Sequence, residues 1–206
     1  SKGHGCMALY AVLADKGFFK KAALETFCSA DSFLGGHPEQ TKVPGVEAST
    51  GSLGHGLSIA VGLALGFRIK KVTNKVYVLI GDGELNEGSI WEAFLCASKH
   101  KLSNLFILID YNKLQSSGSI SEVLEIEPLK QKLQSFRLAV SEVDGHNVNA
   151  ISEKLAEEPE HNNKPRIIIC HTIKGKGFEF AENNLDYHHR NNITDDELSA
   201  MKKSLL

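Results

Sequence analysis

Cysteine is scarce in this sequence. Four cysteines stand among its 206 residues, at positions 6, 28, 96 and 170, and no two of them have the C-x-x-C spacing of zinc knuckles and redox pairs. A disulfide framework or a zinc site is therefore not expected. We expect reduced and mostly buried thiols, which indicate a reducing, cytoplasmic compartment.

Long apolar runs and an excess of positive charge are also absent. No apolar stretch is long enough to cross a bilayer, and residues 1–5 do not have the pattern of a signal peptide. The 23 Lys and Arg residues are balanced by 25 Asp and Glu, which gives a net charge of −2. Because binding to a nucleic-acid backbone depends on a basic surface, we expect neither a membrane nor a nucleic acid as partner.

What the sequence has is the composition of a folded domain. Hydrophobic residues make up 42 % and charged residues 23 %, which is close to the average of globular proteins. A chain of this length buries enough surface for a substantial core. We interpret residues 1–206 as one domain, and because the chain opens at Ser1 inside a motif, we expect an upstream segment to be missing.

Four short apolar runs predict buried strands, and helical patterns alternate with them. The expected strands lie at 76–80, 105–109, 138–143 and 166–170, and the expected helices at 8–15, 20–28, 54–70, 87–100, 128–134, 149–158 and 195–206. Such alternation is typical of a parallel sheet covered on both faces. The predicted fold is therefore α/β, with three α-β-α layers and a mostly parallel central sheet. Residues 29–52, rich in Gly, Ser, Thr and Pro, predict a long irregular loop, and such loops tend to carry function.

Polar residues follow two of the predicted strands directly. Gly-Asp-Gly at 81–83 follows the first, and Asp-Tyr-Asn at 110–112 ends the second. Ligands of parallel sheets bind at the carboxyl ends of strands. The carboxylate of Asp82, the amide oxygen of Asn112 and glycine N–H groups suit a diphosphate held with Mg²⁺ or Ca²⁺. The alternative is that both side chains only form turns after their strands.

These two motifs resemble the diphosphate-binding motif of thiamine-diphosphate enzymes, and the wider chain resembles transketolases. The motifs that carry the resemblance are Ser-Lys-Gly-His-Gly at 1–5, Gly-His-Pro-Glu at 36–39, Pro-Gly-Val-Glu at 44–47, Thr-Gly-Ser-Leu-Gly at 50–54, Gly-Glu-Leu-Asn-Glu-Gly at 83–88 and Lys-Gly-Lys-Gly at 174–177. They follow the order of the family and cover nearly the whole chain. Residues 174–184 and 187–189 are most similar to two-subunit transketolases, in which this half is a separate polypeptide.

The resemblance implies a set of cofactor and metal contacts. Asp82, Asn112 and the backbone carbonyl of Leu114 are implied as ligands of Mg²⁺ or Ca²⁺. The residues implied to contact thiamine diphosphate are His4, Gly51, Ser52, Leu53, Asp82, Gly83, Glu84, Asn112 and Leu114. Ser52 stands where the family usually has Pro.

Three histidines and a glutamate are implied in catalysis. His37 and His188 are implied to line the substrate channel near the reacting carbon, and His4 to lie near the diphosphate and the substrate. Because His189 follows His188, either of the two fits the channel position. Glu87 is implied to join a carboxylate network that links paired active sites across a dimer. From the residues alone, His4 and His37 are also explained as loop and turn residues, and Glu87 as a favourable charge in the first turn of a helix.

The implied reaction transfers a two-carbon ketol unit from a ketose to an aldose, with sugars or sugar phosphates as substrates. The glutamate that activates the cofactor's aminopyrimidine belongs, in this family, to a pyrimidine-binding domain that does not fit within 206 residues. A pyrimidine-domain partner chain is therefore implied, in a homodimer of this domain or a heterotetramer. Trp91 and Phe94 of the predicted helix 87–100 are expected to be buried against another chain, since aromatic anchors are typical of such interfaces.

Three other functions stay open from the sequence. One is another thiamine-diphosphate carboligase, such as a relative of deoxyxylulose-phosphate synthase, and a second is a non-catalytic subunit that binds only the cofactor or a partner. The third is a metal phosphohydrolase that uses Asp82, although no second acidic ligand is apparent. Binding of thiamine diphosphate would distinguish the phosphohydrolase from the other functions. Turnover with a partner chain would distinguish the carboligase from the non-catalytic subunit.

Overall fold

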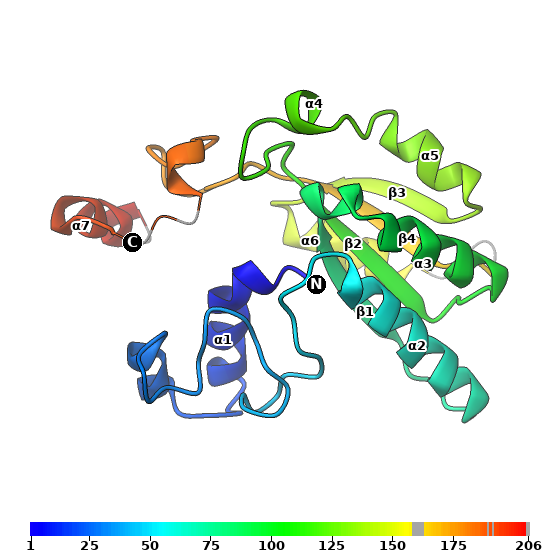
Figure 1. The fold of residues 1–206 in the computed structure, drawn as a ribbon, viewed down its shortest axis with the longest axis horizontal. Helices are drawn as coiled ribbons and strands as arrows, with labels where there is room; N and C mark the ends of the chain where they lie inside the picture. Colours follow the sequence, from blue (N-terminus) through cyan, green and yellow to red (C-terminus); the bar gives the residue numbers. More distant parts are fainter. Residues whose placement is uncertain (158–162, 189, 191, 205–206) are drawn as a thin grey trace.

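The protein folds around a parallel β-sheet, seen in the computed structural model in Figure 1. The structure describes residues 1–157, 163–188, 190 and 192–204. Its strands are β1 (Val76–Gly81), β2 (Leu105–Tyr111), β3 (Ala139–Asp144) and β4 (Arg166–His171). They lie in the order β1-β2-β4-β3, and every neighbouring pair is parallel. The predicted parallel α/β sheet is confirmed.

The register brings the carboxyl ends of the strands to one edge of the sheet. Gly81 of β1 is level with Asp110 of β2, which is level with Cys170 of β4. On the far side of β4, His171 is level with Asp144 of β3. Residues that follow these positions are therefore neighbours in space although they are far apart in the sequence.

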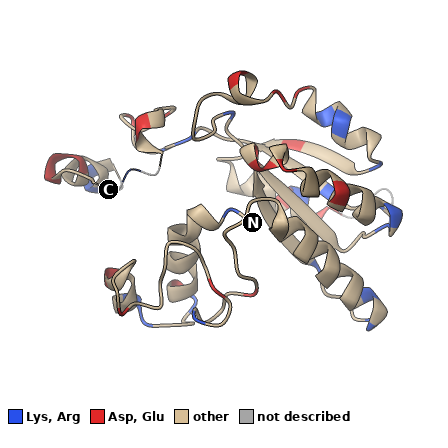
Figure 2. Ribbon diagram, viewed as in Figure 1, with Lys and Arg blue, Asp and Glu red and all other residues tan. Residues whose placement is uncertain are grey.

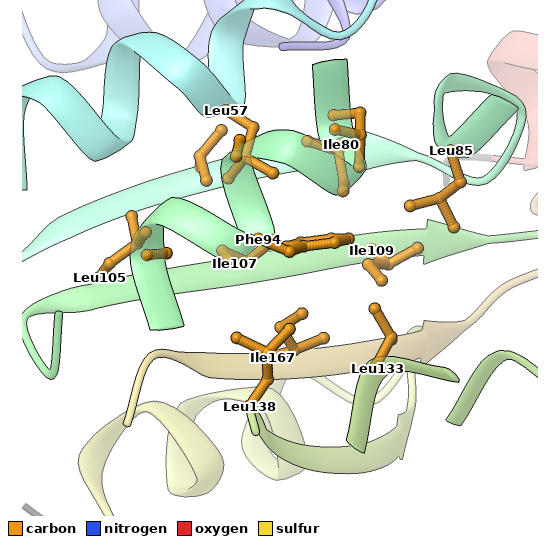
Figure 3. Close-up of a cluster of buried hydrophobic side chains, with 14 of the residues drawn as sticks. Leu57, Ile80, Leu85, Phe94, Leu105, Ile107, Ile109, Leu133, Leu138 and Ile167 are labelled. Carbon is orange, nitrogen blue, oxygen red and sulfur yellow. The ribbon is translucent and has the colours of Figure 1, made fainter. Parts of the chain in front are cut away.

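Three helices cover one face of the sheet. They are α2 (His55–Ile69), α3 (Gly88–Lys99) and α5 (Leu129–Ser135). Side chains alternate between the two faces of a strand, so Ile107 and Ile109 point to the same side, and Figure 3 shows them beside Phe94 of α3. This is the main hydrophobic core, and it holds the carboxyl ends of β1 and β2 in place.

The opposite face is covered only in part. Helix α6 (Val148–Ala156) packs over Val143, Ile168 and Cys170. Tyr77 and Leu79 of β1, on the same face, are 53 % and 46 % exposed. Among the described residues, the predicted cover on both faces is therefore present over β3 and β4 and incomplete over β1.

The first 52 residues pack around a smaller core of their own. The 3-10 helix η1 (Gly3–Gly5) leads into α1 (Cys6–Asp15), and Tyr10 donates a hydrogen bond to the carbonyl of Gly35 at 2.8 Å. The segment predicted as a helix at 20–28 forms the 3-10 helix η2 (Lys21–Thr26) instead, and it stops before Cys28, whose φ is 58°. Residues 29–52 contain no helix or strand, as predicted.

The remaining short elements follow the strand ends or form the tail. The 3-10 helices are η3 (Gly83–Asn86) and η4 (Leu185–Tyr187), and the α-helices are α4 (Ile120–Val123) and α7 (Asp195–Ser204). The sequence did not predict α4, a single turn that a capping box between Ser119 and Glu122 starts. Thr194 caps α7 as predicted, because its hydroxyl accepts the N–H of Glu197 at 3.3 Å. Residues 158 and 205–206, included in predicted helices, lie outside the described residues.

Lys and Arg residues lie at the amino edge of the sheet, where α2 and α3 end (Figure 2). Arg68, Lys70 and Lys71 stand at the end of α2, and Lys99 and Lys101 at the end of α3. Cations at the C-terminus of a helix are stabilised by its dipole, so this charge has a structural explanation. No helix in the described part of the chain has both the length and the apolar character of a membrane span.

Candidate functional site

Asp82 places a buried carboxylate at the carboxyl end of β1. Only 3 % of its surface is exposed. One carboxylate oxygen accepts the N–H of Gly83 at 2.7 Å, and the other accepts the N–H of Lys113 at 2.5 Å. Burial raises the pKa of Asp82, and the two N–H groups offset part of this rise. Because each carboxylate oxygen has two lone pairs, both oxygens retain capacity for a further ligand.

A second carboxylate, that of Asp110, lies beside Asp82 at the end of β2. The N–H of Asp82 donates to the carbonyl of Asp110 at 3.2 Å, and the Asp110 side chain accepts hydrogen bonds from the ammonium of Lys2 and the hydroxyl of Thr172. Burial alone would raise the pKa of Asp110, but Lys2 and these hydrogen bonds outweigh burial and hold the pKa below its usual value. Lys2 thus ties the first residues of the chain to the sheet edge.

A second cation, Lys174, reaches the same edge from the segment after β4. Its side chain is partly buried. Burial and the charge of Lys2 lower the pKa of Lys174, while the charges of Asp110 and Asp82 raise it in part. Two cations among two carboxylates give this edge a mixed charge that suits a ligand carrying both phosphate groups and a cation.

The loop after β2 folds back against Asp82. The side-chain oxygen of Asn112 accepts the N–H of Leu114 at 3.0 Å, and Lys113 between them has a φ of 65°. The groups that a cation could use are the Asp82 carboxylate, the Asn112 amide oxygen and the Leu114 carbonyl, and hard cations such as Mg²⁺ and Ca²⁺ prefer oxygen ligands. Across the described ranges, no three His, Cys, Asp or Glu side chains gather as a metal site. A cation here would therefore depend on amide and carbonyl oxygens and on oxygens of the ligand itself.

A buried donor beside Gly83 lacks a hydrogen-bond partner within the described structure. The amide nitrogen Nε2 of Gln115 is buried and donates to nothing there. A Cβ added to Gly83 would lie 3.1 Å from Cγ of Gln115, so the two residues are in close contact. An unpaired buried polar group costs about 1–3 kcal/mol. An anionic oxygen bound beside Gly83 would accept a hydrogen bond from this amide and remove the cost. The unpaired amide of Gln115 is therefore the observation that fits a diphosphate here.

The three predicted histidines come together from three separate segments. His4 belongs to η1, and its ring centroid lies 6.4 Å from that of His188. His37, from the long loop, lies against the backbone of Gly3, where an added Cβ would be 2.7 Å from the imidazole Cδ2. His189, the alternative to His188, lies outside the described residues. The structure therefore brings His37 and His188 close to the segment that carries Gly3 and His4, which Lys2 anchors to Asp110.

Glu84 joins the loop before α2 to the loop after β1. Its carboxylate accepts the N–H of Gly54 at 2.7 Å and the N–H of Gly81 at 3.2 Å. These bonds fix the end of the exposed turn formed by Gly51, Ser52 and Leu53. In this structure, Glu84 holds the loop in place, and its direct contact with a cofactor stays a prediction.

Glu87 borders the same loop from the start of α3. Its Cβ lies 2.8 Å from the position that a Cβ on Gly54 would take, and Gly54 has a φ of 84°. A larger residue at position 54 would therefore clash with Glu87 and strain the backbone. The carboxylate of Glu87 belongs to an exposed residue, which leaves it accessible to another chain.

The predicted interface role of Trp91 and Phe94 is wrong for Phe94. This side chain is fully buried in the core of its own chain. Trp91 is partly buried, packs edge-on against Phe94 with ring centroids 5.8 Å apart, and donates its indole N–H to the carbonyl of Leu85 at 2.8 Å. The helical spacing identified an apolar face of α3 correctly, but that face points to the sheet.

The model of the family described as the thiamine diphosphate binding domain of transketolase matches residues 1–205. The chain belongs to the transketolase family. One subunit of the apulose-4-phosphate transketolase of Actinobacillus succinogenes is 44 % identical over 190 residues, which are 92 % of this chain and 68 % of that polypeptide. The 6-deoxy-6-sulfo-D-fructose transketolase subunit SqwG of Clostridium sp. is 42 % identical over 188 residues, which are 91 % of this chain and 68 % of that polypeptide.

Solved transketolases share the fold. The transketolase of Pichia stipitis, in complex with sedoheptulose-7-phosphate, is 30 % identical with a TM-score of 0.89, and the match covers 98 % of this chain and 31 % of that one. This transketolase domain therefore spans about a third of the length of that enzyme. The resemblance inferred from the motifs and the predicted fold class are both confirmed.

Sequence reasoning missed four residues that shape the site of this transketolase domain. They are Lys2, Asp110, Gln115 and Lys174. Lys2, Asp110 and Lys174 lie inside motifs that carry the resemblance, so the available signal was a charge beside a glycine for the two lysines and a charge at a strand end for Asp110. Gln115 offered no signal, because only the tertiary structure shows that its amide is buried beside Gly83.

Proposed function

We propose that this chain is the diphosphate-binding half of a transketolase that transfers a two-carbon ketol unit from a ketose to an aldose. The observation that supports it best is the buried Asp82 carboxylate at the sheet edge, with the cation Lys2 bonded to neighbouring Asp110, in a chain matched by the family's cofactor-binding domain. A metal phosphohydrolase does not account for that match.

The chain's own residues have distinct roles toward the cofactor. Asp82, Asn112 and the carbonyl of Leu114 would hold Mg²⁺ or Ca²⁺. The diphosphate would bind beside Gly83, where the buried Nε2 of Gln115 has no partner among the described residues, and Gly51, Ser52 and Leu53 would border the rings of the cofactor. Bound thiamine diphosphate supplies the electron sink for the carbon–carbon bond chemistry.

The histidines serve the sugar rather than the cofactor. An imidazole gains and loses protons near neutral pH, and general acid–base groups must reach the hydroxyls that exchange protons. His4, His37 and His188 come from three segments and lie around η1, and this proximity supports a shared role. We assign them to proton movement at, and orientation of, the substrate hydroxyls.

The partner and the substrates follow from the relatives. Both of the relatives described above are named as single subunits of their transketolases, which supports a pyrimidine-domain partner chain that contributes the activating glutamate. Exposed Glu87 beside the cofactor loop fits a contact between paired sites in a homodimer or a heterotetramer. The substrates would be ketoses and aldoses bearing an anionic group, and the enzyme would act in the cytoplasm.

Titration calorimetry with thiamine diphosphate and Mg²⁺ tests the cofactor site. The Asp82→Ala variant is expected to lose Mg²⁺-dependent binding while it retains the wild-type far-UV spectrum, because Asp82 stands at a strand end and packs no core. The matched control is Asp15→Ala, which removes a carboxylate from the exposed surface of α1. Equal affinity of Asp82→Ala and the control would remove Asp82 from the site and contradict the proposed function.

A further inference from the structure

The Asp-Gly-His turn after β3 lies against the strand that leads to Lys174. The N–H of Gly145 donates to the carbonyl of His171 at 2.8 Å, which adds one more rung to the pairing of β3 with β4. A Cβ on Gly145 would clash with the Thr172 methyl group and would lie 3.0 Å from Cβ of Cys170. Glycine at 145 therefore allows the turn to approach the end of β4 closely.

The next rung of this ladder is made by a side chain. In a continuing parallel pair, the N–H of Ile173 would bond to the carbonyl of Gly145, but the chain turns away there to begin α6. Instead, the N–H of Ile173 donates to Nε2 of His146 at 2.8 Å. The imidazole takes the place of a missing strand carbonyl. Because the N–H of Thr172 already donates to the carbonyl of Tyr111 at 3.1 Å, the bond from His146 extends the hydrogen-bonded part of this chain by one residue, to Ile173.

Side chains of the turn fix the backbone around His146. The side chain of Asp144 accepts the N–H of His146 at 2.9 Å, and Asn147 caps α6 through the N–H of Ala150 at 3.1 Å. These two side chains fix the backbone on both sides of His146. The hydrogen bond to Ile173 therefore comes from a residue whose backbone is fixed on both sides.

The segment that begins at Ile173 is compact and carries two site residues. The N–H of Asn183 donates to the carbonyl of Lys174 at 2.9 Å, and Gly177 donates to the carboxylate of Glu182 at 3.2 Å. Figure 1 shows this part of the chain beyond the end of the sheet, joined to it by one extended stretch. Lys174 lies near the carboxylate pair and His188 lies near His4. The direction of the chain at Ile173 thus determines where both side chains lie.

We propose that His146 is a positioning residue, whose Nε2 anchors Ile173 and thereby orients residues 174–188 over the site. The catalytic part of this inference rests on the proposed function, while the anchoring part does not. Among the described residues, the hydrogen bonds of His146 join it to Asp144 and Ile173 and to none of the residues assigned to cofactor or metal, so its effect on the site would pass through the backbone of Ile173.

Three variants test whether His146 acts as a hydrogen-bond acceptor or only fills space in the packing. His146→Leu removes the acceptor, His146→Gln offers an amide oxygen in its place, and His100→Leu is the control at the opposite edge of the sheet. In the cofactor-free chain, amide exchange of Ile173 measured by NMR is expected to be roughly three- to tenfold faster in His146→Leu, the range for one lost hydrogen bond. His146→Gln and His100→Leu are expected to exchange at the wild-type rate.

Kinetics with the partner chain test the consequence for the site. His146→Leu is expected to lower kcat about ten- to a hundredfold, because small misplacements of catalytic groups are costly, and to change the affinity for thiamine diphosphate less. His146→Gln should restore most of the loss. An unchanged Ile173 exchange rate, a wild-type kcat in His146→Leu, or equal damage in His146→Gln would each overturn the proposal. If the wild-type chain with its partner transfers no ketol unit, the proposed function fails, and the exchange rates still decide whether His146 is the anchor.

Discussion

Gly3 lets three segments of the site meet because it has no side chain. Its backbone lies against Thr50 and His37, and a Cβ there would overlap the Thr50 hydroxyl and lie 2.7 Å from the imidazole of His37. Gly5, two residues later in the same segment, has open space where a Cβ would lie. The position of His37 therefore depends on the size of residue 3.

Gly3→Ala is expected to destabilise the chain by about 1–3 kcal/mol, the usual cost of overpacking. Gly5→Ala is the matched control, with an expected change within about 0.5 kcal/mol because nothing lies near its new methyl group. Urea unfolding midpoints measure both. Equal midpoints for the two variants would contradict the tight packing at Gly3.

Gln115→Leu tests the buried amide beside Gly83. The variant keeps the volume of the side chain but cannot donate, so the affinity for thiamine diphosphate is expected to fall roughly three- to thirtyfold, while the stability of the cofactor-free chain holds or rises. Ser117→Ala, in the exposed part of the same loop, is the control. Calorimetric binding and thermal unfolding of the same samples give both readings, and a variant that binds as tightly as the control would exclude Gln115 from the site.

His37→Ala and His188→Ala test the assignment of the histidines to the substrate. Each is expected to lower kcat about 100- to 10,000-fold, the usual contribution of a general acid or base, with little change in cofactor affinity. Steady-state kinetics with the partner chain, beside cofactor titration, distinguish the two effects. If His189→Ala loses activity and His188→Ala does not, the channel histidine is His189. A large loss of cofactor binding would make these histidines anchors instead.

At the scale of elements, the tail helix α7 depends on one carboxylate. Glu197 accepts hydrogen bonds from the Tyr187 hydroxyl and from the N–H of Thr194 at 2.8 Å, and it pairs with Arg190 at 2.9 Å. The Tyr187 hydroxyl and the N–H of Thr194 are the main causes that lower the pKa of Glu197 to about 2. The same group therefore caps α7 and links it to η4.

A lowered folded-state pKa means that Glu197 supports this contact only while it is ionised. The support is present above the ordinary pKa of 4.5 and is lost as the pH falls from about 4.5 to about 2. The ¹³C shift of the Glu197 carboxyl, followed by NMR, is expected to titrate near pH 2, and the amide signals of α7 should change with it. Glu197→Gln should lack the α7 response, and Asp196→Asn should retain it. A carboxyl that titrates near 4.5 would show that the capping contacts are absent in solution.

The sequence predicts which face of a helix is apolar, but it does not predict what that face packs against. The apolar face of α3 could be read from spacing, but its partner could not. Trp91 and Phe94 pack on Phe136, which follows α5 and lies more than forty residues further along the chain. Whether an aromatic side chain faces its own sheet or another protein depends on such distant contacts.

At the scale of the whole molecule, the exposed apolar residues of β1 and the exposed Glu87 lie outside the cores of this chain. Isolated surface apolar residues are common, but two on one strand face agree with the proposed assembly with a partner chain. The residues proposed to hold the cofactor and a cation belong to this chain, while the group that activates the aminopyrimidine is not among the residues assigned to the site.

The chain by itself is expected to bind thiamine diphosphate weakly and to transfer no ketol unit. Addition of the pyrimidine-domain chain should restore turnover, and light scattering should show the mass of a heterotetramer. The controls are the partner alone and the partner with Asp82→Ala. Full activity from this chain alone would contradict the division of the active site between two chains.

The sequence by itself determined the local and periodic features of this protein. Apolar runs specified the strands, turn residues specified their ends, and Asp82 and Asn112 marked the candidate site because strand ends in parallel sheets are where ligands bind. The tertiary structure alone decided which distant groups meet. The hydroxyl of Thr172 reaches Asp110 across sixty-two positions, and the imidazole of His146 replaces a strand carbonyl for Ile173. Such pairings depend on strand order and register, which no short window of residues encodes.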